Sequence, residues 1–269
     1  MKPIILITGT STGIGAALAK AAMKDYRVLG SSRNPRSDPS LGFKEYLLDL
    51  ANLEDIEAFA DELVKDLKGA KLHAIVHNAG VMIPGTVLYT PVETFAYQLQ
   101  VNLLGLYQLT QLLIPVMEDG DGRILNIGSI SASFSNPFQG MYSASKSSLA
   151  CMTKSWRIEL EPKGIQVSQL DFGNVRTGIH KRAIRQFDEL LQGASDFSHL
   201  IPNIRKLILN KERKAMSADK AAQYVLGILK KSRLKAFYLL GTDAQRLKLI
   251  RRLPKPWLEA LIKRKIGLR

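Results

Sequence analysis

The sequence predicts an α/β protein with a doubly wound, seven-stranded, mostly parallel sheet that carries helices on both faces. Two observations lead to this fold class. Short runs of β-branched and aliphatic residues alternate with longer helical patterns through most of the chain, and these runs contain few polar residues. Near-continuous apolar strands are typical of a parallel sheet covered on both faces, and such sheets bind ligands at the carboxyl ends of their strands.

The predicted elements alternate along the chain. Strands are expected over residues 4–7, 27–31, 45–48, 74–77, 123–127, 166–170 and 236–239. Helices are expected over residues 13–24, 53–67, 92–117, 141–161 and 218–229. Residues 178–217 break the alternation because they mix Ile, Leu and Phe with Lys and Arg, and we expect a mobile substrate lid there.

The length of 269 residues favours one domain with an extension, because α/β folds of about 250 residues often form a single unit. We expect a dinucleotide-binding and catalytic domain over residues 1–240 and a basic amphipathic extension over residues 241–269. The single cysteine, Cys151, excludes an intramolecular disulfide and a Cys-cluster metal site. The four histidines show no metal-ligand spacing, so no metal is expected.

The longest stretch without a charged side chain covers residues 94–117. Five amide side chains interrupt it, and each would need a partner in hydrocarbon. We therefore expect a buried or subunit-interface helix rather than a membrane span, and with it a homo-oligomer. The apolar residues 4–7 are too few for the core of a signal peptide, which favours a cytoplasmic protein.

The net charge of +14 comes from the last quarter of the chain. Residues 1–200 contain 19 basic and 20 acidic residues, whereas residues 201–269 contain 19 basic and 4 acidic residues. Such an asymmetry predicts an anionic partner for the C-terminal region. No motif of a nucleic-acid-binding module is recognisable, so nucleic acid is not the expected partner.

A basic amphipathic helix is predicted at the end of the chain, where Pro256 suits the first helical turn. Trp257, Leu258, Leu261 and Ile262 share one face of it. An aromatic anchor on a basic helix is typical of peripheral contact with an anionic membrane surface. The alternative is a helix that packs its apolar face on the parent domain and exposes its charges to water.

A glycine-rich turn follows the first predicted strand and leads into the first predicted helix. Glycines at such a junction allow a tight turn and let the backbone approach a pyrophosphate, whose charge then faces the amino end of the helix. A plain turn is the alternative, because the spacing differs from the commoner G-x-G-x-x-G, but the placement favours a nucleotide. The residues predicted to bind it are Gly9, Ser11, Thr12, Gly13, Ile14 and Gly15.

The end of the second predicted strand is expected to select the cofactor. A carboxylate there would bind the adenosine 2′-hydroxyl of NAD, whereas a cation would accept the 2′-phosphate of NADP. The sequence offers Ser32 and Arg33 and no acid. We therefore expect NADP, with NADPH preferred over NADH; a solvated loop arginine is the alternative for Arg33.

A tyrosine and a lysine four residues apart begin the helix predicted over residues 141–161, so Tyr142 and Lys146 share one helical face. Ser129 follows the fifth predicted strand. A neighbouring ammonium stabilises a phenolate, so the pKa of Tyr142 is expected to fall from about 10 towards the working pH. Such a tyrosine exchanges a proton with a reacting hydroxyl or carbonyl.

With these motifs the sequence resembles the short-chain dehydrogenase/reductase family. The glycine-rich turn, the triplet Asn78-Ala79-Gly80, Asn102, Ser129 and the Y-x-x-x-K pair occur in the family's order and approximate spacing. The resemblance covers about residues 4–170 and continues more weakly to about residue 240. It implies a Rossmann-like fold.

The resemblance also implies a role for each matching residue. Tyr142 would be the general acid/base, and Lys146 would lower its pKa while binding the nicotinamide ribose. Ser129 would hold the substrate oxygen, and Asn102 would support a water-linked proton path through Lys146. Further cofactor contacts are implied for Asp49, Leu50, Asn78, Ala79, Gly80, Val175 and Thr177.

Two positions depart from the family's pattern. Phe172 stands where the family usually has proline, which leaves the local backbone and the nicotinamide contacts open. Thr12 stands where many NADP-dependent members carry a basic residue. Arg33 would therefore contact the phosphate largely alone.

These observations predict an NADP-dependent oxidoreductase that interconverts a carbonyl and an alcohol by hydride transfer, with Tyr142 as general acid/base. The apolar lid and the amphipathic tail favour a small lipophilic substrate of the steroid, retinoid or long-chain acyl type. The alternative is an NADP-binding adaptor on a membrane surface with vestigial catalysis. The complete set of Asn102, Ser129, Tyr142 and Lys146 argues against that alternative.

Overall fold

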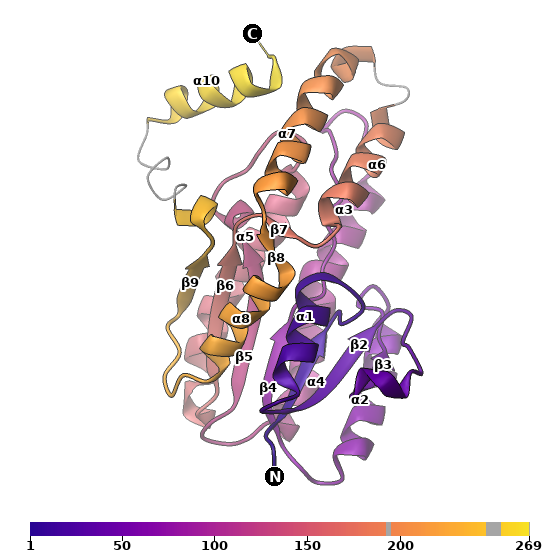
Figure 1. The fold of residues 1–269 in the computed structure, drawn as a ribbon, viewed down its shortest axis with the longest axis vertical. Helices are drawn as coiled ribbons and strands as arrows, with labels where there is room; N and C mark the ends of the chain where they lie inside the picture. The colour runs from indigo at the N-terminus through magenta and orange to yellow at the C-terminus, as the bar shows by residue number, and fades with distance from the viewer. Residues whose placement is uncertain (192–194, 246–253, 269) are drawn as a thin grey trace.

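A seven-stranded sheet forms the centre of the molecule in a computed structural model, which describes residues 1–191, 195–245 and 254–268 (Figure 1). The strand order is β3-β2-β1-β4-β5-β6-β9, and each neighbouring pair is parallel. The predicted doubly wound α/β fold is therefore confirmed. The strands are β1 (Ile4–Thr8), β2 (Arg27–Ser32), β3 (Lys44–Leu47), β4 (Leu72–His77), β5 (Arg123–Ser129), β6 (Gln166–Phe172) and β9 (Phe237–Leu240).

Helices cover both faces of this sheet. Residues of β1 alternate between the two cores: Leu6 packs on one face and Ile5 and Ile7 pack on the other, and all three are fully buried. Burial of each such side chain stabilises the fold by about 1.5–3 kcal/mol. The helices on the Leu6 face are α2 (Leu53–Leu67), α4 (Gly105–Leu113) and α5 (Gly140–Glu159), and those on the opposite face are α1 (Gly13–Ala22) and α8 (Ala218–Leu229).

The helix predicted over residues 92–117 is divided. It consists of α3 (Val92–Leu99), a π-helical turn over Gln100–Leu104, α4 and a 3₁₀ turn over Ile114–Val116. Gly105 follows the π turn and lies against the Leu50 carbonyl, where an added Cβ would stand 2.2 Å from that oxygen. The π turn contains the buried Asn102, and π-helical turns occur frequently at functional sites.

The segment predicted as a lid folds into two helices beyond the carboxyl edge of the sheet (Figure 1). These are α6 (Ile179–Leu191) and α7 (Ile201–Lys214), joined by a 3₁₀ turn over Ser195–Leu200. Two short parallel strands flank them, β7 (Val175–Arg176) and β8 (Met216–Ser217). Phe187, Leu200 and Ile204 form a small core between the helices. The mobility of this segment stays a prediction.

The C-terminal helix α10 (Lys255–Ile266) packs on α7, and its Ile266 joins the small core of the lid. Of the four residues expected to share one face of this helix, Leu258 and Ile262 are half-buried, whereas Trp257 and Leu261 are 71% and 38% exposed. The reason is that α7 and α10 meet along one row of side chains only, Leu258, Ile262 and Ile266, spaced four apart. The basic residues at 246–252 lie outside the described residues, and the domain division at residue 240 stays a prediction.

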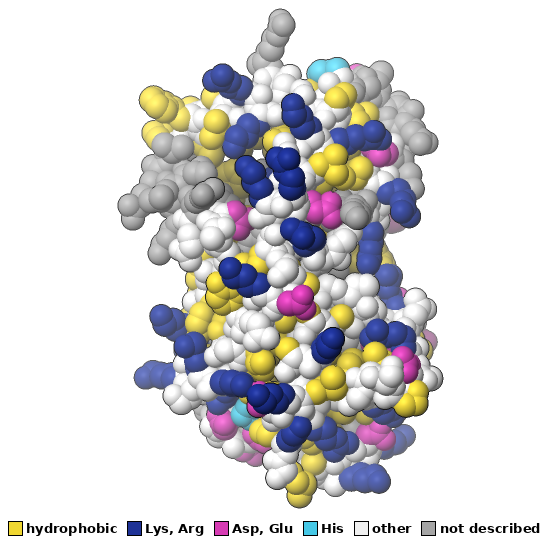
Figure 2. All heavy atoms as spheres, in the orientation of Figure 1, with side chains coloured by type: hydrophobic (Ala, Val, Ile, Leu, Met, Phe, Trp, Pro, Cys, Tyr) yellow, Lys and Arg dark blue, Asp and Glu magenta, His cyan; other side chains and the backbone are white. Residues whose placement is uncertain are grey.

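Lys and Arg side chains spread over the part of the surface formed by α6, α7 and α10, at the top of Figure 2. Basic side chains are also spread over the lower half of this face (Figure 2). No helix in the described part of the chain is both long and apolar enough to span a bilayer.

Candidate active site

The glycine-rich turn lies at the carboxyl end of β1 and leads directly into α1. Gly9 and Gly13 have φ angles of +75° and +64°, which only glycine adopts without strain. At Gly15 an added Cβ would stand 2.1 Å from the Gly9 carbonyl oxygen. Thr12, the N-cap of α1, makes no side-chain capping bond, so the first backbone N–H groups of the helix remain available. This cradle fits the pyrophosphate of a dinucleotide.

The end of β2 and the glycine-rich turn line one cavity. The Ser32 hydroxyl is buried and has no hydrogen-bond partner among the described residues. Arg33 is exposed, and its Nη1 donates to the Tyr97 hydroxyl at 3.3 Å. The next basic residue, Arg36, is instead held by two 3.0 Å bonds to Glu45. Ser32 and Arg33 thus bring a buried hydroxyl and an exposed cation to the lining of the cavity.

The remaining predicted cofactor residues line this cavity as well. Asn78 Nδ2 donates to the carbonyl oxygens of Thr8 and Gly9 at 2.9 and 3.1 Å, which braces the glycine-rich turn. Asp49 Oδ1 accepts a bond from the Ala51 N–H at 2.9 Å and does not cap α2, because Asn52 does so. The members of this group are Asp49, Leu50, Asn78, Ala79, Gly80, Val175 and Thr177.

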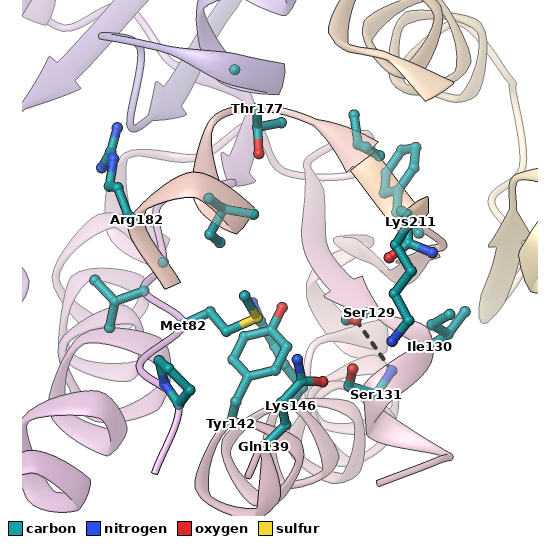
Figure 3. Close-up of a pocket in the computed structure, with 18 of the residues that line it drawn as sticks. Met82, Ser129, Ile130, Ser131, Gln139, Tyr142, Lys146, Thr177, Arg182 and Lys211 are labelled. Atoms are coloured by element: carbon teal, nitrogen blue, oxygen red, sulfur yellow. Dashed lines mark hydrogen bonds between the residues drawn. The ribbon is translucent and has the colours of Figure 1, made fainter. Parts of the chain in front are cut away.

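Tyr142, Ser129 and Lys146 meet at the cavity (Figure 3). Ser129 ends β5, and Tyr142 and Lys146 lie in the first turns of α5, which packs beside that strand end. The Tyr142 phenol and the Ser129 side chain line the same cavity, and Ser129 Oγ accepts a hydrogen bond from the Ser131 N–H at 3.1 Å. Lys146 Nζ donates to the Ile127 carbonyl oxygen at 2.9 Å. The structure therefore brings together the three residues that the sequence pattern singled out for proton transfer.

The expected fall in the pKa of Tyr142 is wrong. Burial raises the pKa of Tyr142 to about 12, and the nearby charge of Asp171 raises it further, whereas the hydrogen bond with Ser129 opposes both. Burial also lowers the pKa of Lys146 to about 8. The physical reason is desolvation, which disfavours both the phenolate and the ammonium. At neutral pH the phenol is protonated, the form that donates a proton.

Asn102 lies in the π turn and is fully buried. Its Nδ2 donates to the Val81 carbonyl at 2.9 Å and to Ser145 Oγ at 3.0 Å, and its Oδ1 accepts from the Val81 N–H at 2.8 Å. An added Cβ on Gly80 would stand 3.1 Å from this Oδ1 and 3.6 Å from Lys146 Nζ. Asn102 thereby holds the loop after β4 against α5, and the water-linked proton path stays a prediction.

Phe172, which stands where the family usually has proline, is the last residue of β6. Phe172, unlike proline, has a backbone N–H, the strand continues through it, and the Gly173 N–H donates to the Leu240 carbonyl at 2.9 Å. The following turn is held by Asp243, which accepts from Asn174 N–H at 2.7 Å. Thr177 packs against Gly13, where an added Cβ would stand 2.9 Å from the Thr177 Cβ. Thr177 therefore covers the glycine-rich turn.

Asp171 is a site residue that sequence reasoning missed. It pairs with Gly128 across β5 and β6, is almost completely buried, and accepts a 2.8 Å bond from Gln169 Nε2. Burial raises the pKa of Asp171 to about 6, and the nearby Lys146 charge opposes this. The available signal was an acidic residue at the carboxyl end of an otherwise uncharged strand.

The far half of the cavity is lined by lid and tail residues and is largely apolar. The whole cavity has a volume of about 720 Å³. Phe138 contributes its ring from the loop before α5 and has a φ of +65°, an unfavourable angle for a bulky residue. Its edge-on packing against Phe187 and Phe197, at 5.2 and 5.5 Å between ring centres, holds it there.

The closest approach to a metal-ligand arrangement among the described residues lies at the opposite edge of the sheet. His73 Nδ1 stands 2.8 Å from Glu118 and 3.9 Å from Asp121, while Arg123 binds Asp121 at 2.9 Å. These contacts describe an ion-pair cluster. His77, which precedes the triplet at Asn78, is fully buried against the Thr110 hydroxyl, and burial lowers its pKa to about 3, so it stays neutral.

Comparison with known proteins identifies relatives along most of the chain. A family model described as short chain dehydrogenase matches residues 3–187. The uncharacterized oxidoreductase YbbO of Escherichia coli (strain K12) is 35% identical over 182 residues, which cover 66% of this chain and 67% of that protein. The probable short-chain type dehydrogenase/reductase VdlC of Helicobacter pylori is 27% identical over 267 residues, which cover 96% of each chain.

Solved structures agree with the fold. A short-chain dehydrogenase from Streptomyces avermitilis is 24% identical and has a TM-score of 0.78, covering 96% of this chain and 97% of that chain. A short chain dehydrogenase from Burkholderia cenocepacia, solved in complex with NADP, has a TM-score of 0.74 at 21% identity, covering 97% of each chain. With the family model matching well over half of its length, the chain belongs to the short-chain dehydrogenase/reductase family and is an NAD(P)-dependent oxidoreductase.

Proposed function

We propose that this protein reduces a carbonyl group on a small lipophilic substrate with NADPH, with Tyr142 as the general acid. The observation that carries the proposal is the convergence of Tyr142, Ser129 and Lys146 on a cavity shared with the glycine-rich turn. The alcohol oxidation is the reverse of the same reaction.

The nicotinamide cofactor supplies the hydride when it is bound. Tyr142 donates its phenolic proton to the substrate oxygen during reduction, and it takes that proton back during oxidation. Ser129, which lines the same cavity, positions that oxygen. Lys146 keeps an ammonium beside the phenol, and its donors not used by the Ile127 carbonyl are available to the cofactor's ribose. Asn102 acts through its bonds to Val81 and Ser145, which hold this arrangement in place.

NADP is proposed over NAD because of the end of β2. A 2′-phosphate would receive a bond from the unpartnered Ser32 hydroxyl and a charge from Arg33. The one acid nearby on β3, Glu45, is already bonded to Thr10 at 2.6 Å and to Arg36. The relative from Burkholderia cenocepacia was solved with NADP, which is compatible with this choice.

The lipophilic character of the substrate follows from the far half of the cavity. The aromatic and aliphatic side chains Phe138, Phe187, Leu207 and Ile208 line it, together with the inner row of α10. We further propose that α10 brings the protein to anionic membranes, because the exposed Trp257 is surrounded in sequence by basic residues. A membrane-bound adaptor with vestigial catalysis would share this surface.

Turnover distinguishes the enzyme from the adaptor. NADPH oxidation is measured with a panel of lipophilic ketones for the wild type and for Tyr142→Phe. We expect wild-type turnover and a loss of about 10²–10⁴-fold in kcat for the variant, the range for a positioned general acid. NADPH binding, followed by fluorescence titration, is the control and changes little. Wild-type protein that binds NADPH but turns over no ketone supports the adaptor instead.

A further inference from the structure

Positive charge gathers in the substrate half of the cavity. Lys211 and Lys214 of α7 and Lys265 of α10 all line it, and Arg182 of α6 does so from the other side. The described acid that lines this half, Asp243, is already occupied. Its Oδ2 accepts from Asn174 N–H and Nδ2, both at 2.7 Å, and its Oδ1 accepts from the Ala244 N–H at 3.0 Å.

Lys211 is the cation that lies deepest. Its side chain extends from α7 into the cavity towards the turn that follows Ser129 (Figure 3). Burial lowers the pKa of Lys211, and the neighbouring Lys265 lowers it further, while Asp243 acts on it only through space. Exposed lysines ordinarily extend into water, so an ammonium directed inwards without a hydrogen-bonded carboxylate is unfavourable.

The second ammonium comes from a different helix. Lys265 is exposed on α10 and lines the same cavity as Lys211, because α10 packs on α7 and Ile266, next to Lys265, is buried in the lid core. Asn203 of α7 also donates to the Ile266 carbonyl, so the contact keeps Lys265 near α7. An anion bound between the two ammonium groups satisfies both cations.

We propose that Lys211, assisted by Lys265, binds an anionic group of the substrate, so that the natural substrate is an amphipathic carbonyl compound carrying a carboxylate or a phosphate. This inference rests on the proposed carbonyl reduction and narrows its substrate class. The apolar side chains of the same half bind the hydrocarbon part, and Tyr142 and Ser129 act on the carbonyl.

The kinetic test compares a homologous series of methyl keto acids with their methyl esters, which differ in the charge. For the wild type, kcat/KM is expected to favour the acid at one or more chain lengths. Lys211→Met should lower the acid-to-ester ratio about tenfold or more, the usual strength of a charged hydrogen bond, and Lys211→Arg should retain most of it. Lys206→Met, an exposed lysine on the same helix that does not line the cavity, is the matched control.

A binding measurement tests the subsite without turnover. Calorimetric titration of the NADP-loaded protein with dodecanoate, dodecyl phosphate and 1-dodecanol compares a carboxylate, a phosphate and a neutral head group. Both anions should bind more tightly than the alcohol, and Lys211→Met should remove most of that difference. The tighter of the two anions identifies which group the subsite prefers.

The outcomes separate the two proposals. If the wild type prefers the ester at every chain length, or if Lys211→Met behaves as Lys206→Met does, the anion subsite is wrong and the carbonyl reductase remains. If neither acids nor esters nor neutral ketones are reduced, the proposed function fails, and the dodecanoate and dodecyl phosphate titrations alone decide the subsite. Equal affinity of all three dodecyl compounds overturns it.

Discussion

Asp171, near the end of β6, influences the protonation of Tyr142 and Lys146 on α5, and the charge of Lys146 in turn opposes the rise in the pKa of Asp171. Asp171 raises the pKa of both Tyr142 and Lys146 through its charge. A buried acid therefore favours the protonated phenol, which suits a general acid. We assign Asp171 the role of a positioning residue, because it acts through these two side chains.

Asp171→Asn should alter stability with pH. The folded-state pKa of about 6 lies above the ordinary value of 3.8, so the folded state binds more protons between these limits and stability falls as pH rises through them. The variant should therefore be more stable than the wild type at pH 7, by up to about 3 kcal/mol, and the advantage should vanish near pH 4. Thermal unfolding at several pH values measures this.

The same variant should shift the pH profile of ketone reduction. Without the Asp171 charge the pKa of Tyr142 falls, so the alkaline loss of kcat/KM moves to lower pH. For the stability measurement, Asp66→Asn is the control. Lys44 and Tyr46 lower the pKa of the Asp66 carboxyl, so its replacement should destabilise the protein at pH 7, the opposite of the effect expected for Asp171→Asn. An unmoved pH profile would show that Asp171 has no influence on Tyr142.

We also expect single residues to decide the choice between NADP and NAD. Arg33→Ala should weaken NADPH binding by about 1.5–3 kcal/mol, the range for charged hydrogen bonds, and should barely change NADH binding. Ser32→Asp should favour NADH by repelling the 2′-phosphate. Arg36→Ala is the matched control: it leaves the buried Glu45 carboxylate unpaired and should lower Tm without changing the NADPH-to-NADH ratio. A wild type that uses NADH as well as NADPH contradicts the proposal.

The helix α10 packs on α7 and exposes its aromatic side chain. Leu258, Ile262 and Ile266 pack towards the cavity and α7, Leu261 lines the cavity and is 38% exposed, and Trp257 is 71% exposed. The exposed apolar side chains of α10 are too few to cross about 30 Å of hydrocarbon. A position in the plane of the interface is therefore the geometry that membrane contact would take.

Sedimentation with liposomes that contain anionic lipid tests α10. The full chain should bind at low salt and dissociate at high salt, because charge attraction of about 1 kcal/mol per basic residue supplements apolar burial. Trp257→Ala should weaken binding while leaving Tm unchanged, since the ring is exposed. Truncation before Arg246 should abolish binding and also loosen the lid, which loses Ile266. Full-length protein that stays in the supernatant at low salt would favour a helix that only packs on the domain.

For the whole molecule we propose a homo-oligomer that forms through the helices on the Leu6 face of the sheet. Leu104 and Tyr107 are 50% and 41% exposed, and Ile158 on α5 is 72% exposed. α5 packs beside the π turn, and the rings of Tyr107 and Trp156 lie 6.0 Å apart. These neighbouring helices thus expose apolar side chains to water. Such exposed apolar surface is typical of a subunit interface when the monomer is considered alone.

Light scattering coupled to size-exclusion chromatography measures the assembly. The wild type should have a mass of at least twice 29.8 kDa, the mass of one chain. Ile158→Glu should shift the mass towards that of the monomer, because it would bury a charge in the interface. Lys231→Glu, an exposed residue after α8, is the control that should leave the mass unchanged. A monomeric wild type would rule out this interface.

The sheet and the succession of strands and helices along the chain could be derived from the sequence, and so could the residues that we predict for proton transfer. The strands were recognisable because both of their faces are buried, which makes them nearly continuous in apolar residues. The predicted limits of α2 and α8 agree with the structure because local capping residues, Asn52 and Ser217, begin these helices. Tyr142 and Lys146 could be recognised because they are four positions apart in one helix and so share a face.

Only the tertiary structure decided the electrostatics and the substrate half of the cavity. The pKa of Tyr142 depends on its burial and on Asp171, which β6 places opposite Gly128 of β5. Lys211 reaches the cavity because α7 folds back over the carboxyl edge of the sheet, and α10 closes the same space from the end of the chain. Desolvation and contacts between distant segments have no local period or motif, so neither could be derived from the order of the residues.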